Sequence, residues 1–141
     1  STLYGDMCGG FAPIKDLYKT DAYALARWRN ENHPRWIEND IKRVMPDNLI
    51  TKAPTAELRP NQKDEDSLPP YPTLDAILKM MIENDAGVDE VAAAGYDEAT
   101  VRKVWSMLHR AEFKRKQGAQ GIKLSRRSFD EDWNFPITKK V

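Results

Sequence analysis

Lys19 and Thr55 are the two side chains whose type and position best suit phosphate binding. Lys19 falls in the first turn of a predicted helix, where unpaired N–H groups and the helix dipole attract anions and the ammonium adds a charge. Thr55 follows Pro54, and a hydroxyl beside backbone N–H groups in a rigid turn can hold an oxyanion. Structural roles are also open, because Lys19 fits a solvated helix lysine and Thr55 fits a helix cap.

Thr55 belongs to a long polar loop that covers about residues 51–72. The loop is rich in hydroxyl, amide and carboxylate side chains, is interrupted by prolines and holds too few apolar residues for a core element. A polar loop of this length inside a compact domain is usually either functional or disordered. The loop is therefore the first place to look for a ligand site.

Acidic residues in the same loop raise the question of a metal. Asp64, Glu65 and Asp66 are consecutive, and Mg²⁺ typically uses one or two carboxylates together with phosphate oxygens. We favour the alternative, a solvated cluster of loop acids. His33 and His109 stand far apart without a cysteine or carboxylate pattern around them, which argues against zinc. We predict no metal-ligating residue in this chain.

A second group of cations lies on the last long predicted helix. When the apolar stripe of this helix faces the core, the 3.6-residue period puts Lys103, Arg110 and Lys114 together on the opposite side. Such a basic face suits an anionic ligand. A solvated charged surface is the alternative, and it is the preferred interpretation for Lys103.

Apolar side chains recur at helical spacing in several segments, so the sequence predicts a mainly helical chain. Pro34 suits the first position of a helix, Thr73 and Asp97 suit N-caps, and Gly95 suits a helix stop. The tail beyond residue 118 has no regular pattern. We expect helices at about residues 17–30, 34–44, 73–84, 88–94 and 97–117, and a strand fragment at residues 49–50.

Composition limits the broad class of protein. The 141 residues suit one domain, and 22 basic residues balance 22 acidic ones, so no net charge attracts the chain to nucleic acid or membrane. Cys8 is the only cysteine, which excludes an internal disulfide and fits a reducing compartment. No apolar run approaches the roughly 20 residues of a membrane span. We expect a cytoplasmic protein with no nucleic-acid or membrane partner.

Motifs of a known family occur in order along the chain. They are residues 1–7 (STLYGDM) and 13–20 (PIKDLYKT), residues 52–59 (KAPTAELR) with 68–71 (LPPY), residues 110–117 (RAEFKRKQ), and residues 135–138 (FPIT). Together they resemble bacterial NAD synthetases, specifically the long glutamine-dependent form. The resemblance covers nearly the whole chain, and the agreement of several motifs is more specific than any one alone.

The resemblance implies an activity and a set of ligands. The whole enzyme would convert deamido-NAD to NAD through an adenylated intermediate, using ATP with Mg²⁺ and ammonia from the glutaminase domain of the same enzyme. It implies a homo-oligomer and no proton-transferring catalytic residue in this chain. By matching positions, Lys19 and Thr55 would contact ATP. The residues implied to contact deamido-NAD are Ser1, Thr2, Leu3 and Lys114.

One motif of the family has no counterpart here. Family members carry a Ser-Gly-Gly-x-Asp-Ser loop for pyrophosphate, whereas Gly10 is followed by Phe11 and Ala12 in this sequence. We therefore expect residues 1–141 to be the C-terminal portion of the synthetase domain and the piece alone to be inactive. The expected fold is the C-terminal helical portion of a Rossmann-like α/β adenine-nucleotide hydrolase (ATP-pyrophosphatase) domain.

An interpretation from another class is a small nucleic-acid-binding module. Residues 88–94, a glycine turn and a basic helix at 97–117 fit a helix-turn-helix pattern. Zero net charge and the long polar loop argue against it. We keep it as the alternative to the ligase.

Overall fold

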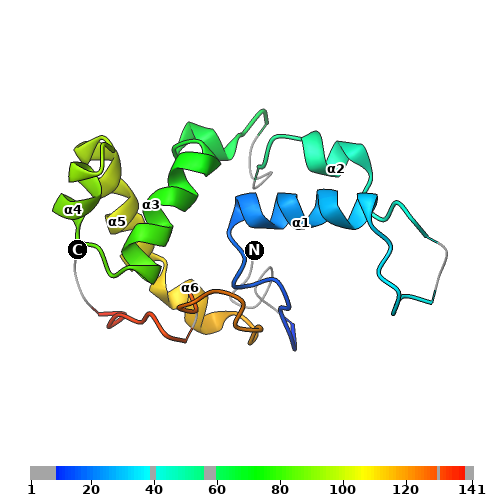
Figure 1. Ribbon diagram of the computed structural model, residues 1–141. Helices are drawn as coiled ribbons and strands as arrows, with labels where there is room; N and C mark the ends of the chain where they lie inside the picture. Colours follow the sequence, from blue (N-terminus) through cyan, green and yellow to red (C-terminus); the bar gives the residue numbers. More distant parts are fainter. Residues whose placement is uncertain (1–8, 39–40, 56–59, 130, 139–141) are drawn as a thin grey trace. The chain divides into compact units, whose positions relative to one another are not determined.

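A computed structural model describes residues 9–38, 41–55, 60–129 and 131–138 of the chain. The described residues are mainly helical, as the sequence predicts, and they divide into two compact units. The first unit comprises Ser1–Leu17 with Pro72–Val141, and the second comprises Tyr18–Tyr71. The helices of Figure 1 are α1 (Lys19–Glu31), α2 (Asp47–Thr51), the 3₁₀ turn η1 (Asp64–Asp66), α3 (Tyr71–Glu83), α4 (Val88–Ala93), α5 (Glu98–Arg110) and α6 (Glu112–Gln117).

The first unit has its core between α3, α4 and α5, and α4 packs directly on α5 (Figure 1). Apolar residues three or four positions apart form one face of each helix, so burying that face removes a continuous stripe from water. The stripe predicted for α5 is confirmed, since Val101, Val104 and Leu108 are buried. The other buried apolar residues of this unit are Leu74, Ile77, Met81, Ile82, Val91 and Trp133.

The start of α5 follows the predicted capping. The carboxylate of Asp97 accepts hydrogen bonds from the backbone N–H of Thr100 at 2.8 Å and from its hydroxyl at 2.7 Å. These bonds, the hydroxyl bond first, lower the pKa of Asp97. The cap satisfies an N–H group that the first helical turn leaves without a partner.

The end of this helix differs from the prediction of one helix to about residue 117. The helix stops at Arg110, and α6 begins at Glu112 after a break at Ala111, whose ψ is 0°. Lys114 N–H bonds to the Ala111 carbonyl, three residues back, rather than four. A tightened turn of this kind changes the direction of the chain, and its sequence contains no glycine or proline that would predict the break.

The second unit contains α1 and α2, which pack on each other. The first helix lies close to its predicted range. The predicted helix over residues 34–44 is wrong, because the described residues of this range contain no helix. The predicted strand at residues 49–50 is also wrong, since both residues belong to α2, which starts after Pro46.

Side chains of α1 explain the missing second helix. The Asn30 side-chain oxygen accepts hydrogen bonds from the N–H groups of Val44 and Met45, at 3.0 and 2.8 Å. The Arg29 guanidinium donates to the carbonyls of Ile41 and Lys42. These contacts satisfy backbone groups that a local helix would otherwise have paired.

The predicted polar loop is confirmed as largely irregular in its described residues, 52–55 and 60–70, with η1 as its one helical turn there. The following helix begins at Tyr71, two residues before the predicted cap at Thr73. No described helix is both long and apolar enough to cross a membrane.

Candidate functional site

Lys19 is the first residue of α1, and its side chain is exposed. Its ammonium lies 5.7 Å from the ring centre of Tyr23 and 5.8 Å from that of Tyr71. Both distances fall within the range of about 6 Å over which a cation is attracted to an aromatic face. Two rings therefore restrict a side chain that would otherwise sample many rotamers in solvent.

A positive stripe continues along α1 from Lys19. Tyr23 and Arg27 follow at intervals of four residues, and the Arg27 guanidinium lies 5.9 Å from the Tyr23 ring centre. One aromatic ring thus separates two cations on one face of the helix. A cavity of about 150 Å³ lies beside this stripe, and its lining is Lys19, Ala22, Tyr23, Ala26, Met45, Leu49 and Ile50.

Thr55 is half-buried in the polar loop. A series of contacts connects the residue before it with Lys19. The N–H group of Asp64 donates to the carbonyl of Pro54, which precedes Thr55, at 3.0 Å. The Tyr71 hydroxyl donates to the Asp64 carboxylate at 2.6 Å. A chain of contacts inside the second unit thus runs from the Lys19 ammonium through Tyr71 and Asp64 to the backbone beside Thr55.

The other predicted site residues do not belong to this group. Lys114 is exposed on α6, in the first unit. Lys103 and Arg110 are exposed on α5, as predicted for a basic face. The predicted contacts at residues 1–3 lie outside the described residues.

Two of the acidic loop residues, Asp64 and Asp66, accept hydrogen bonds from the protein. The Asp64 carboxylate accepts from Tyr71, and the Asp66 carboxylate accepts from the backbone N–H of Lys63 at 3.1 Å. Within the described ranges no group of three histidine, cysteine, aspartate or glutamate side chains is arranged to hold a metal ion. The hydrogen bond from Tyr71 to Asp64 is a structural contact that the sequence interpretation did not include.

The sequence interpretation also missed Lys15 and Asp16, which precede α1 in the motif at residues 13–20. The Lys15 ammonium donates to the carbonyls of Arg115 and Ala119, at 3.2 and 2.9 Å, and so caps the C-terminal end of α6. The Ala12 N–H donates to Gln120 at 2.8 Å. This short segment holds the end of α6 and the residues that follow it.

Asp16 is buried, and its carboxylate organises the tail after α6. Its two oxygens accept from the N–H groups of Leu124, Ser125 and Phe129 at 2.7 to 2.8 Å, and from the Ser125 hydroxyl at 2.8 Å. Burial acts to raise the pKa of Asp16, but the hydrogen bonds from Ser125, Phe129 and Leu124 together outweigh it and the pKa is lowered. The charged carboxylate is therefore the form that the folded chain binds.

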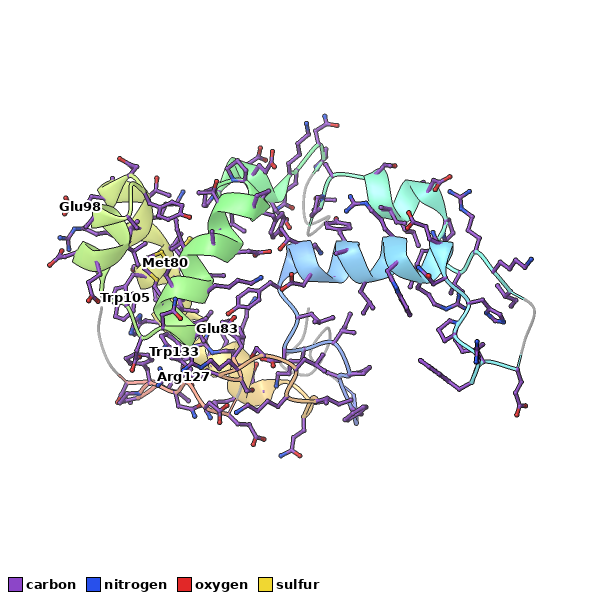
Figure 2. All side chains as sticks on the ribbon, in the orientation of Figure 1. Met80, Glu83, Glu98, Trp105, Arg127 and Trp133 are labelled. Atoms are coloured by element: carbon purple, nitrogen blue, oxygen red, sulfur yellow. The ribbon has the colours of Figure 1, made fainter. Side chains whose placement is uncertain are left out.

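An aromatic cluster and a buried ion pair also pack against the tail that follows α6. Figure 2 shows the labelled Trp105 and Trp133 in the first unit, and their ring centres lie 6.3 Å apart. Buried His109 packs on both rings and on Phe135, with its Nδ1 2.8 Å from the Trp105 carbonyl. The same tail reaches α3 through Arg127, which donates to the Ile82 carbonyl at 3.3 Å.

Arg115 and Glu112 form an ion pair at 2.5 Å, with side chains only 5% and 2% exposed. The Arg115 guanidinium also donates to the Leu108 carbonyl and lies 4.9 Å from the Phe129 ring centre and 5.3 Å from that of Trp133. The basic motif at residues 110–117 therefore contains both core and surface cations. Arg115 belongs to the core, whereas Lys114 faces solvent.

Comparisons with known proteins place the chain among synthetases. It is 49% identical over 140 residues to the glutamine-dependent NAD(+) synthetase of Thermotoga maritima, which covers 99% of this chain and 23% of that protein. It is 47% identical over 139 residues to the protein of the same name from Rhodobacter capsulatus, covering 99% and 25%. The chain thus spans about a quarter of the length of the curated relatives it matches.

Residues 1–118 match the family described as NAD synthase. The chain belongs to the NAD synthase family. The fold is also similar to that of the glutamine-dependent NAD+ synthetase from Acinetobacter baumannii, solved in complex with adenosine diphosphate, with a TM-score of 0.50 and 40% identity over 97% of this chain and 22% of that one. The resemblance noted in the motifs is confirmed at the level of the family, and the helix-turn-helix alternative receives no support.

Proposed function

We propose that this chain is part of a glutamine-dependent NAD synthetase, an ATP-dependent ligase that converts deamido-NAD to NAD. The observation that carries the proposal is the family match over residues 1–118, with near-full coverage of this chain by relatives of that name. The ADP complex of the structural relative supports a nucleotide as one ligand. We assign these residues to the C-terminal portion of the ligase domain, with the Rossmann-like ATP-pyrophosphatase fold.

Lys19 and Thr55 are the residues that we assign to ATP. The Lys19 ammonium is exposed at the start of a thirteen-residue helix, where both its charge and the helix N-terminus favour phosphate. Thr55 adds a hydroxyl next to Pro54, whose carbonyl accepts the N–H of Asp64. The contacts that link the two residues through Tyr71 support a single phosphate site in the second unit. Mg²⁺ would accompany ATP and neutralise phosphate charge.

Ser1, Thr2, Leu3 and Lys114 are assigned to deamido-NAD by the matching motifs. The exposure of Lys114 supports this role, whereas neighbouring Arg115 is buried in an ion pair. A flexible lysine at a surface suits a phosphate or carboxylate as a mobile point charge. The two anionic nucleotides are thus assigned to different lysines, the dinucleotide to Lys114 and ATP to Lys19.

The reaction needs charge stabilisation more than proton transfer. The nicotinate carboxylate of deamido-NAD attacks the α-phosphorus of ATP, and pyrophosphate leaves. Ammonia then attacks the adenylated carbonyl and loses one proton to solvent, so that the amide forms and AMP departs with the electron pair of the broken C–O bond. Fixed cations and hydroxyls lower the energy of the departing pyrophosphate, and holding both nucleotides converts a bimolecular encounter into an oriented one.

The wider context of the enzyme is part of the same proposal. Ammonia would come from a glutaminase domain of the same enzyme, and the protein would act in the cytoplasm as a homo-oligomer. The glutamine-dependent names of the relatives support the source of ammonia.

The test is a product assay on the full-length protein that contains this chain. With deamido-NAD, Mg-ATP and either glutamine or ammonia, we expect NAD, AMP and pyrophosphate in equal amounts. Formation of ADP and phosphate instead, or no NAD with either nitrogen source, would contradict the proposal.

A further inference from the structure

We propose that Tyr71 and Asp64 are positioning residues that hold the Lys19 ammonium in place for phosphate. The inference rests on the proposed ATP role of Lys19. Neither Tyr71 nor Asp64 is required to touch the nucleotide. Their effect on the reaction passes through Lys19 on one side and through the backbone beside Thr55 on the other.

The Tyr71 ring makes the contact with Lys19. The ammonium lies 5.8 Å from its centre, and 5.7 Å from the ring of Tyr23 on the same helix as Lys19. Tyr23 lies on the same helix, four residues from Lys19, so its ring cannot fix the ammonium relative to a segment outside α1. Tyr71 is far along the chain, so its ring orients the ammonium with respect to the polar loop. An aromatic face suits this task because it attracts the cation and leaves the N–H donors to a ligand.

Asp64 sets the position of Tyr71. Its carboxylate accepts the Tyr71 hydroxyl at 2.6 Å, within the ordinary range of an O–H···O hydrogen bond. The backbone of Asp64 is anchored as well, since its N–H donates to Pro54 and its carbonyl accepts from Ser67 and Leu68. One residue therefore binds both the Tyr71 side chain beside Lys19 and the backbone of Pro54 beside Thr55.

Substitutions at positions 71 and 64 distinguish a positioning role from direct ligand binding. Phenylalanine at position 71 keeps the ring and loses the hydroxyl, whereas leucine loses both. Asparagine at position 64 keeps an oxygen that accepts the Tyr71 hydroxyl, whereas alanine keeps none. A carboxylate needed for its charge, for example to bind a cation, would not tolerate asparagine.

The experiment measures kcat/KM for ATP in the full-length synthetase, at saturating deamido-NAD and ammonia. Loss of one net hydrogen bond corresponds to about a two- to tenfold decrease, and we expect this from Tyr71→Phe and from Asp64→Ala. Asp64→Asn should retain near wild-type kcat/KM. Tyr71→Leu should cause the larger decrease, mainly through KM for ATP. Tyr96→Phe, the same change in the first unit, serves as the matched control.

A double-mutant cycle with Lys19→Ala gives the decisive measurement. If Tyr71 acts through Lys19, Tyr71→Leu causes no further decrease once Lys19 is alanine. Fully additive decreases would overturn the inference, because Tyr71 would then act without Lys19, for example by supporting the fold. Equal damage from Asp64→Asn and Asp64→Ala would overturn the role of Asp64 as hydrogen-bond acceptor. Unchanged ATP kinetics in Lys19→Ala itself would instead refute the proposed ATP site.

Discussion

Asp16 binds Ser125 twice, through the backbone N–H and through the hydroxyl, each at 2.8 Å. The same carboxylate also accepts the N–H groups of Leu124 and Phe129. A segment just before α1 thus organises a tail that lies more than a hundred residues later. Because the bonded form is the carboxylate, this contact responds to pH and to removal of the charge.

Asp16→Ala should loosen the tail around residues 122–129. Hydrogen bonds to a charged group contribute about 1.5–3 kcal/mol, so amide hydrogen exchange there should speed up about ten- to a hundredfold. Mass spectrometry of deuterated peptides from the full-length protein measures the change. Asp89→Asn, at a side chain that is 93% exposed, is the control. Unchanged exchange in Asp16→Ala would show that the tail is held by other contacts.

The same contact should weaken in acid. The pKa of Asp16 is lower in the folded chain than the usual value of about 3.9. Its contribution is therefore fully present above the unfolded pKa and is lost as pH falls through the folded pKa. Tail exchange, corrected for the intrinsic pH dependence of amides, should rise below about pH 4 in wild type. Asp16→Ala should lack this rise, and an identical rise in both proteins would contradict the assignment.

Breaking the buried pair of Glu112 and Arg115 should destabilise the protein strongly. Both side chains are almost fully buried, so either one alone leaves an uncompensated charge. Removing one partner of such a pair costs about 3–5 kcal/mol. Thermal unfolding of Glu112→Leu and Arg115→Met should show this loss, and the double variant should recover part of it. In contrast, Glu98→Gln breaks the exposed pair with Arg102 and should cost less than about 1 kcal/mol.

Lys19→Ala and Thr55→Ala should impair the use of ATP. A hydrogen bond to a charged phosphate contributes about 1.5–3 kcal/mol, so kcat/KM for ATP should fall about ten- to a hundredfold. The fold should survive, because Lys19 is exposed and Thr55 only half-buried. Lys42→Ala and Thr51→Ala are matched controls from exposed positions of the second unit. Near wild-type kinetics at subsaturating ATP in both test variants would exclude the phosphate assignment.

Lys114→Ala should raise KM for deamido-NAD in the full-length enzyme, since we propose that its ammonium contacts a single dinucleotide. Lys103→Ala, an exposed lysine on α5, should leave KM unchanged.

Titration with duplex DNA tests the alternative class of function. Binding through several phosphates would fall steeply with salt, with a log–log slope of about −0.9 per phosphate neutralised. Tight DNA binding of this kind, with no effect of Lys114→Ala on KM, would favour the nucleic-acid module.

Local sequence patterns determined the start and the buried face of α5. Val101, Val104 and Leu108 recur at helical spacing, and Asp97 has a side chain that caps the turn it precedes. Both signals act within a few residues, so they hold whatever surrounds the helix. The motifs around Lys19, Thr55 and Lys114 likewise identified the family from residue types and order alone.

The tertiary structure decided the elements and contacts whose partners are distant in sequence. Residues 34–44 had a plausible helix start at Pro34, yet Asn30 takes the N–H groups of Val44 and Met45. Nothing local marked Asp16 as a tail-binding carboxylate or Tyr71 as the ring beside Lys19. A hydrogen bond or cation–π contact depends on where two chain segments meet in space, and periodicity within either segment carries no information about that meeting.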